Sequence, residues 1–177
     1  MNLKTACAAI FAATMTFGAA STRAQEVHFA PKEDLARIDV ALIEEANTTI
    51  DLASYALTNR AVLQALLDAD HRGVAIRIVL DPREHHDFAK LDTLSDNVCV
   101  KRGGPFMHLK AYAVDGVLLR TGAANFTESG ERSQDNDLVV IRDAGAAAKF
   151  DAHFERMWDA AMPMDDFEPA IKALEPK

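Results

Sequence analysis

The most informative stretch of the sequence is residues 107–126, MHLKAYAVDGVLLRTGAANF, in which two apolar runs flank an Asp115-Gly116 pair. Such a pair predicts a β-hairpin, because both central residues of a type I′ turn need a positive φ angle. With these two residues as the loop, Val114 is expected to pair with Val117. The strand register of the whole hairpin follows from that pairing.

The predicted hairpin brings candidate chemical groups together. His108 and Lys110 point to one face, roughly 6–7 Å apart at about 3.3 Å per residue. In this register His108 pairs with Ala123, Asn125 arrives beside it, and Gly122 allows close approach of the backbone. Imidazole can attack phosphorus at neutral pH without a metal, and a cation and an amide can stabilise the charge that develops. The pattern therefore favours a phosphate diester as substrate, with no metal and no cofactor.

Outward from the hairpin, strand-like and helix-like patterns alternate, which is typical of an α/β domain. The expected strands are residues 27–29, 50–57, 74–80, 98–100 and 138–141, with a polar loop at 127–136. Helices are expected from residue 35 to about 46, from a cap at Thr58 or Asn59 to Gly73, and from Asp143 to before Pro163. The helix between the second and third strands predicts that those two strands are parallel. Phe150, Phe154 and Met157 form an apolar stripe expected to lie in the core.

Residues 1–24 are predicted to be a signal peptide. Lys4 precedes an apolar run over residues 5–20, and small residues follow at the places that a signal peptidase reads. The alternative is a membrane anchor, but the run is short and no second one follows. Residues 25–177 are then expected to form one catalytic domain in the periplasm or outside the cell, with no integral membrane segment.

The composition narrows the class of protein. The 177 residues, with 49% hydrophobic and 26% charged, exclude collagen-like and disordered chains, and two cysteines do not make a disulfide framework. The net charge of −8 disfavours general adhesion to polyanions, so an anionic substrate needs a locally positive cleft. Six basic residues are candidates for such a cleft: Arg72, Arg77, Arg83, Lys101, Arg102 and Arg120.

The spacing of five residues carries a resemblance to a known family. His108, Lys110, Asp115, Gly122 and Asn125 follow the order His, one residue, Lys, four residues, Asp, six residues, Gly, then two residues and Asn. This pattern resembles the HKD signature of the phospholipase D superfamily and is most similar to the short, exported, Nuc-type endonuclease branch. The resemblance implies a phospholipase D/nuclease-like fold, with a mixed parallel and antiparallel sheet flanked by helices.

The resemblance also implies roles for individual residues. His108 would be the nucleophile that becomes phosphorylated, while Lys110 and Asn125 hold the phosphate. The family needs two such histidines and this motif supplies one, so a homodimer is implied in which the partner's His108 protonates the leaving group. An acidic residue commonly orients the histidine, and the candidates are Asp135 and then Asp137.

Two further motif positions have a supporting part. The turn already explains Asp115, so contact with substrate is not expected there. At position 123 this chain has Ala123, where the family usually has a hydroxyl residue or glycine. The lost hydroxyl removes about 0.5–1.5 kcal/mol of hydrogen bonding, and a reduced rate is expected.

These residues predict a metal-independent phosphodiesterase that acts through a phosphohistidine intermediate. The expected substrate is DNA or RNA, cut by a non-specific endonuclease. One alternative is a phospholipase D that releases phospholipid head groups. A second is a weakly active module that binds phosphate or nucleic acid, suggested by Ala123.

Overall fold

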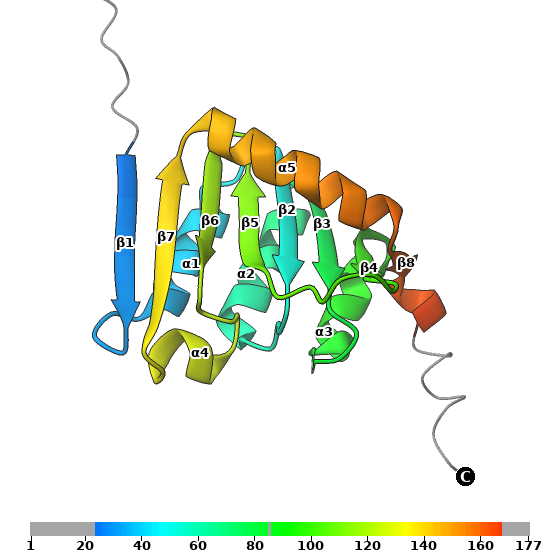
Figure 1. Ribbon diagram of the computed structural model, residues 1–177, viewed down its shortest axis with the longest axis horizontal. Helices are drawn as coiled ribbons and strands as arrows, with labels where there is room; N and C mark the ends of the chain where they lie inside the picture. Colours follow the sequence, from blue (N-terminus) through cyan, green and yellow to red (C-terminus); the bar gives the residue numbers. More distant parts are fainter. Residues whose placement is uncertain (1–23, 85, 168–177) are drawn as a thin grey trace, which may run out of the picture.

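The computed structural model describes residues 24–84 and 86–167, and these residues form an eight-stranded mixed sheet with helices on both faces (Figure 1). The strand order is β1-β7-β6-β5-β2-β3-β4-β8. The strands are β1 (Ala24–Ala30), β2 (Thr49–Ser54), β3 (Ala75–Leu80), β4 (Val98–Val100), β5 (Lys110–Val114), β6 (Leu118–Gly122), β7 (Asn136–Arg142) and β8 (Met162–Pro163). The helices are α1 (Leu35–Glu44), α2 (Arg60–His71), α3 (Phe88–Leu91), the 3-10 helix η1 (Asp92–Asn97), α4 (Glu128–Arg132) and α5 (Ala144–Asp159).

The crossover from β2 through α2 to β3 has the predicted parallel geometry, with Ser54 opposite Leu80 at the end of both strands. Asn59 is the N-cap of α2, and its Oδ1 accepts a hydrogen bond of 2.9 Å from the backbone N–H of Ala61. Gly73, at φ +88°, follows the C-terminal end of the helix. The cap and the glycine were the two sequence signals for this helix, and both are confirmed.

The hairpin of β5 and β6 forms around Asp115 and Gly116 as predicted, at φ +52° and +65°. Its register differs by one residue, because Val114 pairs with Leu118 rather than with Val117. The N–H of Val117 still donates to the carbonyl of Val114 at 3.1 Å, so the predicted turn is present. Val117 is an additional residue after the turn, and its side chain is 56% exposed.

The physical reason for this register lies in the core. Tyr112 pairs with Arg120, and both side chains reach the buried carboxylate of Asp39. The predicted register would have paired Tyr112 with Leu119. The predicted pairing of His108 with Ala123 is therefore also wrong, and β5 begins only at Lys110.

Two core layers sandwich the sheet. Helices α1 and α2 cover one face and α5 crosses the other, as Figure 1 shows. Tyr112 and Val114 belong to the larger core cluster, which also contains residues of α1 and α2, whereas Ala111 and Ala113 pack with Phe154 of α5. The predicted stripe on α5 is confirmed as core, since Phe150, Phe154 and Met157 are buried.

Two elements differ from the sequence expectation. Residues 128–132 of the predicted polar loop form the short helix α4, capped by Thr127, whose Oγ1 accepts a hydrogen bond from the N–H of Gly130 at 3.0 Å. A helix of five residues is too short to show a periodic apolar pattern. Strand β8 also follows the strand that was expected to be the last.

The predicted signal peptide falls almost entirely on residues 1–23, which lie outside the described residues. Its cleavage and the boundary at residue 25 stay predictions. Within residues 24–84 and 86–167, none of the helices has the length and apolarity needed to cross a bilayer.

Candidate active site

His108 and Lys110 lie near the ends of β2 and β3. Lys110 is the first residue of β5 and pairs with Ser54, the last residue of β2. The N–H of Tyr55 donates to the carbonyl of Leu109 at 2.8 Å, which ties the loop before β5 to the end of β2. His108 lies in that loop and its side chain is exposed. The carboxyl ends of strands are the usual location of ligand sites in open α/β sheets.

Lys110 is a nearly buried cation beside His108. Its side chain is 4% exposed, its Nζ donates to the carbonyl of His108 at 2.8 Å, and the same Nζ lies 4.7 Å from the centre of the Tyr55 ring. Burial lowers the pKa of Lys110 to about 8, against the opposing effect of the Glu84 carboxylate. The ammonium group is thus desolvated and close to the candidate nucleophile.

Two aromatic rings fix the imidazole of His108. The Tyr55 ring meets it edge to face at 4.5 Å between centroids, and the Phe106 ring stacks on it at 5.6 Å. The hydroxyl of Tyr55 donates a hydrogen bond to Glu84, which holds the tyrosine in place. His108 therefore has packed neighbours and still meets solvent, as a nucleophile requires.

The side chain of Arg120 connects the backbone of Lys110 with that of Ala124, the residue before Asn125. The guanidinium Nη1 donates to the carbonyl of Lys110 at 2.8 Å and to the carbonyl of Ala124 at 3.4 Å. Among the described residues, the buried Oδ1 of Asn125 has no hydrogen-bond partner. The two ends of an amide can be exchanged by a half-turn, which would put the N–H₂ group at this buried position. The contact of Asn125 with a phosphate stays a prediction.

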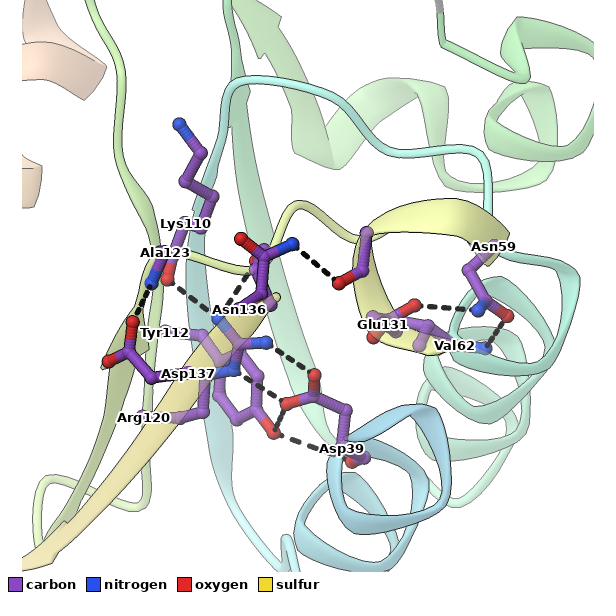
Figure 2. Close-up of polar contacts among 12 residues, drawn as sticks. Asp39, Asn59, Val62, Lys110, Tyr112, Arg120, Ala123, Glu131, Asn136 and Asp137 are labelled. Atoms are coloured by element: carbon purple, nitrogen blue, oxygen red, sulfur yellow. Dashed lines mark hydrogen bonds and ion pairs between the residues drawn. The ribbon is translucent and has the colours of Figure 1, made fainter. Parts of the chain in front are cut away.

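Behind these residues lies a buried polar network, shown in Figure 2. The Asp39 carboxylate accepts hydrogen bonds from Arg120 at 2.8 and 2.6 Å and from the hydroxyl of Tyr112 at 2.8 Å. Asn59 Nδ2 donates to Glu131 Oε2 at 2.6 Å. Burial, followed by the charge of Asp39, raises the pKa of Glu131 to about 9, so Glu131 is protonated at neutral pH.

Gly122 and Asp137 shape the segment that leads to Asn125. Gly122 has φ +147°, and a Cβ there would lie 3.0 Å from the carbonyl carbon of Asp137 and still closer to its oxygen. Asp137 accepts hydrogen bonds from the N–H of Ala123 through Oδ1 and from the N–H of Ala124 through its carbonyl, both at 3.2 Å. Asp137 thus positions the backbone before Asn125, and within the described residues its hydrogen bonds do not involve His108.

Asp135, the first candidate for orienting the histidine, lies on the surface. Within the described part of the chain, its carboxylate makes no hydrogen bond or ion pair, and it does not contact His108. One subunit therefore does not bring Asp135 and His108 together. Its role toward a histidine stays a prediction.

Asp115 lies at the opposite end of β5 from His108. Its carboxylate accepts hydrogen bonds from the N–H groups of Asn47, Thr48 and Thr49 at 3.0, 2.8 and 2.9 Å. These bonds outweigh the effect of partial burial and lower the pKa of Asp115 to about 2. The carboxylate anchors the hairpin turn to the start of β2, in keeping with its interpretation as a turn residue.

Three side chains around His108 were not singled out from the sequence: Tyr55, Glu84 and Phe106. Tyr55 and Glu84 come after β2 and β3, which end at the site. Their positions after two predicted strands were the sequence feature that could have identified them. Of the six candidate cations, Arg72, Arg77 and Arg120 are bound elsewhere, whereas Arg83 lies over the Phe106 ring at 4.0 Å. No group of three or more His, Cys, Asp or Glu residues that could hold a metal ion occurs within the described ranges.

Comparison with known families and proteins agrees with this geometry. A family model described as "Cardiolipin synthase, PLD-like domain" matches residues 40–158. A mitochondrial cardiolipin hydrolase from Chlamydomonas reinhardtii is 27% identical over 118 residues, covering 64% of this chain and 53% of that protein. A phospholipase D from Rickettsia prowazekii is 28% identical over 126 residues, covering 69% and 62% respectively. The chain thus spans somewhat more than half the length of these curated relatives.

Solved structures confirm the expected fold. Nuc from Salmonella typhimurium, described as a phospholipase D family member, superposes with a TM-score of 0.74 at 26% identity, covering 80% of this chain and 98% of Nuc. NucT from Helicobacter pylori superposes with a TM-score of 0.71 at 18% identity, covering 81% and 100%, and supports the fold alone. The mixed sheet flanked by helices and the resemblance to the phospholipase D superfamily are both confirmed. The roles that the motif implies for single residues stay predictions.

Proposed function

Because the chain belongs to the phospholipase D-like domain family, we propose that it hydrolyses phosphodiesters through a covalent phosphohistidine on His108. The observation that carries this proposal is the exposed imidazole of His108 next to the desolvated ammonium of Lys110. An accessible imidazole nucleophile and a fixed cation are the two parts that a metal-independent attack on phosphorus needs.

The reaction proceeds in two displacements. A ring nitrogen of His108 attacks phosphorus, a P–N bond forms, and the P–O bond to the leaving group breaks while the leaving oxygen takes up a proton. Water then attacks phosphorus and gives a proton to the group that protonated the leaving oxygen. The P–N bond breaks, which releases the phosphomonoester and regenerates the imidazole. Lys110 and Asn125 stabilise the non-bridging oxygens in both transition states.

The proton donor in the first step is assigned to the partner's His108 in a homodimer. The motif supplies one histidine per chain, and His108 is exposed at the surface, where a second copy can reach it. Within the same chain the alternative donor is His153 of α5, which lines the same groove as His108.

Mixing wild-type and His108→Asn subunits separates these two donors. If each site needs both copies of His108, the activity falls with the square of the wild-type fraction. A linear fall contradicts the shared site, and loss of activity in His153→Asn would then assign the proton to α5. Sedimentation of the active species provides the second readout, since an active monomer also contradicts the dimer.

The basic test of the function uses bis(p-nitrophenyl) phosphate in buffer that contains EDTA. Wild-type protein is expected to release p-nitrophenol, and His108→Asn is expected to lose at least about 10³-fold in turnover. His71→Asn is the matched control, because His71 is exposed at the end of α2. Equal turnover in the His108→Asn variant contradicts the proposed nucleophile.

Two biological substrate classes are open to such a phosphodiesterase. The names of the curated relatives, cardiolipin hydrolase and phospholipase D, favour a phospholipid. The similarity to Nuc and the motif resemblance to its branch favour DNA or RNA. Nicking of plasmid DNA in EDTA supports the endonuclease, and release of head groups from vesicles supports the phospholipase D. Binding of either substrate without product supports the weakly active module that Ala123 suggested.

Export of the protein to the periplasm or the medium remains part of the proposal. It is supported by the basic start, the apolar run and the small residues at positions 22 and 24. Fractionation of cells that express the full chain, with mass measurement of the exported form, tests both the location and cleavage after residue 24.

A further inference from the structure

A groove with a volume of about 540 Å³ lies beside His108, between the loop of residues 101–109 and the C-terminal half of α5. This loop joins β4 to β5 and passes near the end of α5 in Figure 1. The volume is in the range of sites for small organic ligands. His108 itself lines the groove, so a ligand in the groove is next to the proposed nucleophile.

The groove has apolar walls. Its apolar side chains are Pro105, Phe106, Met107, Leu109, Met157 and Ala160. Phe106 is 49% exposed. It is one of the few large apolar side chains on the described surface that are open to water. The Phe106 ring stacks on His108 at 5.6 Å between centroids, so an apolar group against Phe106 would lie near the proposed nucleophile. Exposed apolar surface of this kind commonly marks a binding groove.

The rim of the groove is positively charged. Lys101, Arg102 and Arg156 line it together with His153, and no acidic side chain is among its described lining residues. The Nζ of Lys101 donates to the carbonyls of Gly103 and Pro105 at 2.5 and 2.6 Å, which fixes the loop and keeps the charge at the rim. In a chain of net charge −8, this local excess of cations selects for an anionic ligand.

Apolar walls, a cationic rim and an adjacent nucleophile together match an anionic amphiphile. We propose that this groove is a subsite for a hydrocarbon chain of an anionic phospholipid, and that Phe106 is its specificity-determining residue. The phosphodiester lies at His108 and Lys110, one chain lies along Phe106, Met107 and Met157, and the rim faces the anionic head-group region. This inference rests on the proposed function, because it assigns the substrate class to the same site.

A polynucleotide fits the walls less well. Its backbone carries a charge at every phosphate, and proteins that bind single strands stack the bases on aromatic side chains along a positive groove. This groove offers one exposed aromatic ring, and its remaining apolar walls are aliphatic or thioether side chains. Aliphatic walls gain free energy from each methylene they remove from water, and a nucleotide has no such chain to bury.

Isothermal titration of alkyl phosphates measures the subsite without any need for turnover. Butyl, hexyl and octyl phosphate, each below its micelle-forming concentration, present the same anionic group with chains of increasing length. The dissociation constant is expected to fall by about tenfold for each two methylenes that enter the groove. The same dissociation constant for butyl and octyl phosphate would overturn the proposal.

A matched pair of variants locates the binding. Phe106→Ser is expected to remove most of the dependence on chain length. Val117→Ser is the control, because Val117 is similarly exposed, at 56%, but lies at the hairpin turn beyond the far end of β5. Equal chain-length dependence in Phe106→Ser and wild-type protein would show that the chain binds elsewhere and would overturn the proposal.

Hydrolysis of bis(p-nitrophenyl) phosphate, measured on the same samples, reports the proposed function separately. Turnover without chain-length dependence overturns the subsite and leaves the function standing. Chain-length dependence without turnover supports the subsite and overturns the function. Tight binding of a thymidine dinucleotide that is weakened by Phe106→Ser, with alkyl phosphates showing no chain-length dependence, would assign the groove to nucleic acid instead.

Discussion

The carboxylate of Asp39 and the guanidinium of Arg120 form a two-pronged ion pair at 2.8 and 2.6 Å, with neither side chain exposed to solvent. The third nitrogen of the same guanidinium donates to the carbonyls of Lys110 and Ala124. One buried pair thus connects α1, the start of β5 and the segment before Asn125. The positions of the candidate catalytic groups therefore depend on this buried network.

Arg120→Met is expected to lower the free energy of unfolding by about 3–5 kcal/mol, because it leaves the Asp39 carboxylate buried without its partner. The double variant Asp39→Leu/Arg120→Met is expected to regain part of the lost stability. Its turnover is expected to stay below that of the wild type, since the carbonyls of Lys110 and Ala124 still lack their donor. Urea unfolding and turnover of bis(p-nitrophenyl) phosphate measure the two effects. A single variant within about 1 kcal/mol of wild type would disprove the structural role.

The lowered pKa of Lys110, about 8, predicts the alkaline limit of activity. The ammonium loses its proton as the pH rises through that value, so kcat/KM is expected to fall above about pH 8. The Glu84 carboxylate raises this pKa, and Glu84→Gln is therefore expected to move the alkaline limb to lower pH. Lys110→Arg keeps its charge, so its residual activity should show no such limb. An unchanged limb in Lys110→Arg would mean that another group titrates there.

Glu131 predicts how stability depends on pH. Its folded pKa of about 9 is raised from an ordinary value of 4.5, so above pH 4.5 the unfolded chain releases a proton that the folded protein keeps. The contribution of Glu131 to stability is therefore complete below pH 4.5 and is lost as the pH rises toward 9, by up to about 1.4 kcal/mol per pH unit. Glu131→Gln should flatten the change between pH 6 and pH 8 in urea unfolding. Parallel curves for the two proteins would contradict the buried, protonated carboxyl.

Two glycines with positive φ provide a matched pair of stability variants. Gly122→Ala places a methyl group against the backbone of Asp137 and Leu138. To relieve this contact, β6 and β7 would have to separate, which would break the hydrogen bonds between them. Gly116→Ala meets nothing within 4 Å and adds only the strain of its φ angle, about 1–2 kcal/mol. Chemical denaturation should show a larger loss for Gly122→Ala. Equal losses would indicate that the close approach at Gly122 relaxes without cost.

Much of this architecture could be predicted from local signals. The Asn59 cap, the positive φ of Gly73 and the Asp115-Gly116 turn are properties of a few neighbouring residues, so the sequence indicates them directly. The motif spacing likewise placed Lys110 beside His108. The interpretation of Asp115 as a turn residue agrees with the five hydrogen bonds that its carboxylate accepts from residues 47–49.

The features that sequence could not predict depend on long-range burial. The register of the hairpin follows from Asp39, which lies 81 positions before its partner Arg120. Arg120 was therefore considered for a surface cleft, although it is fully buried. Tyr55 and Glu84 join the site only because β2 and β3 end beside the loop that carries His108. These relationships come from the sheet order, which no local pattern specifies.

The proposed function depends above all on a covalent bond between His108 and phosphorus during turnover. Acid-free quenching of the reaction with bis(p-nitrophenyl) phosphate, followed by peptide mass spectrometry, measures this directly. We expect a p-nitrophenylphosphoryl group on His108 that forms during turnover and decays as substrate is exhausted, and that is absent from His71 and His153. Full turnover with unmodified His108 at every quench time, or in the His108→Asn variant, would contradict it.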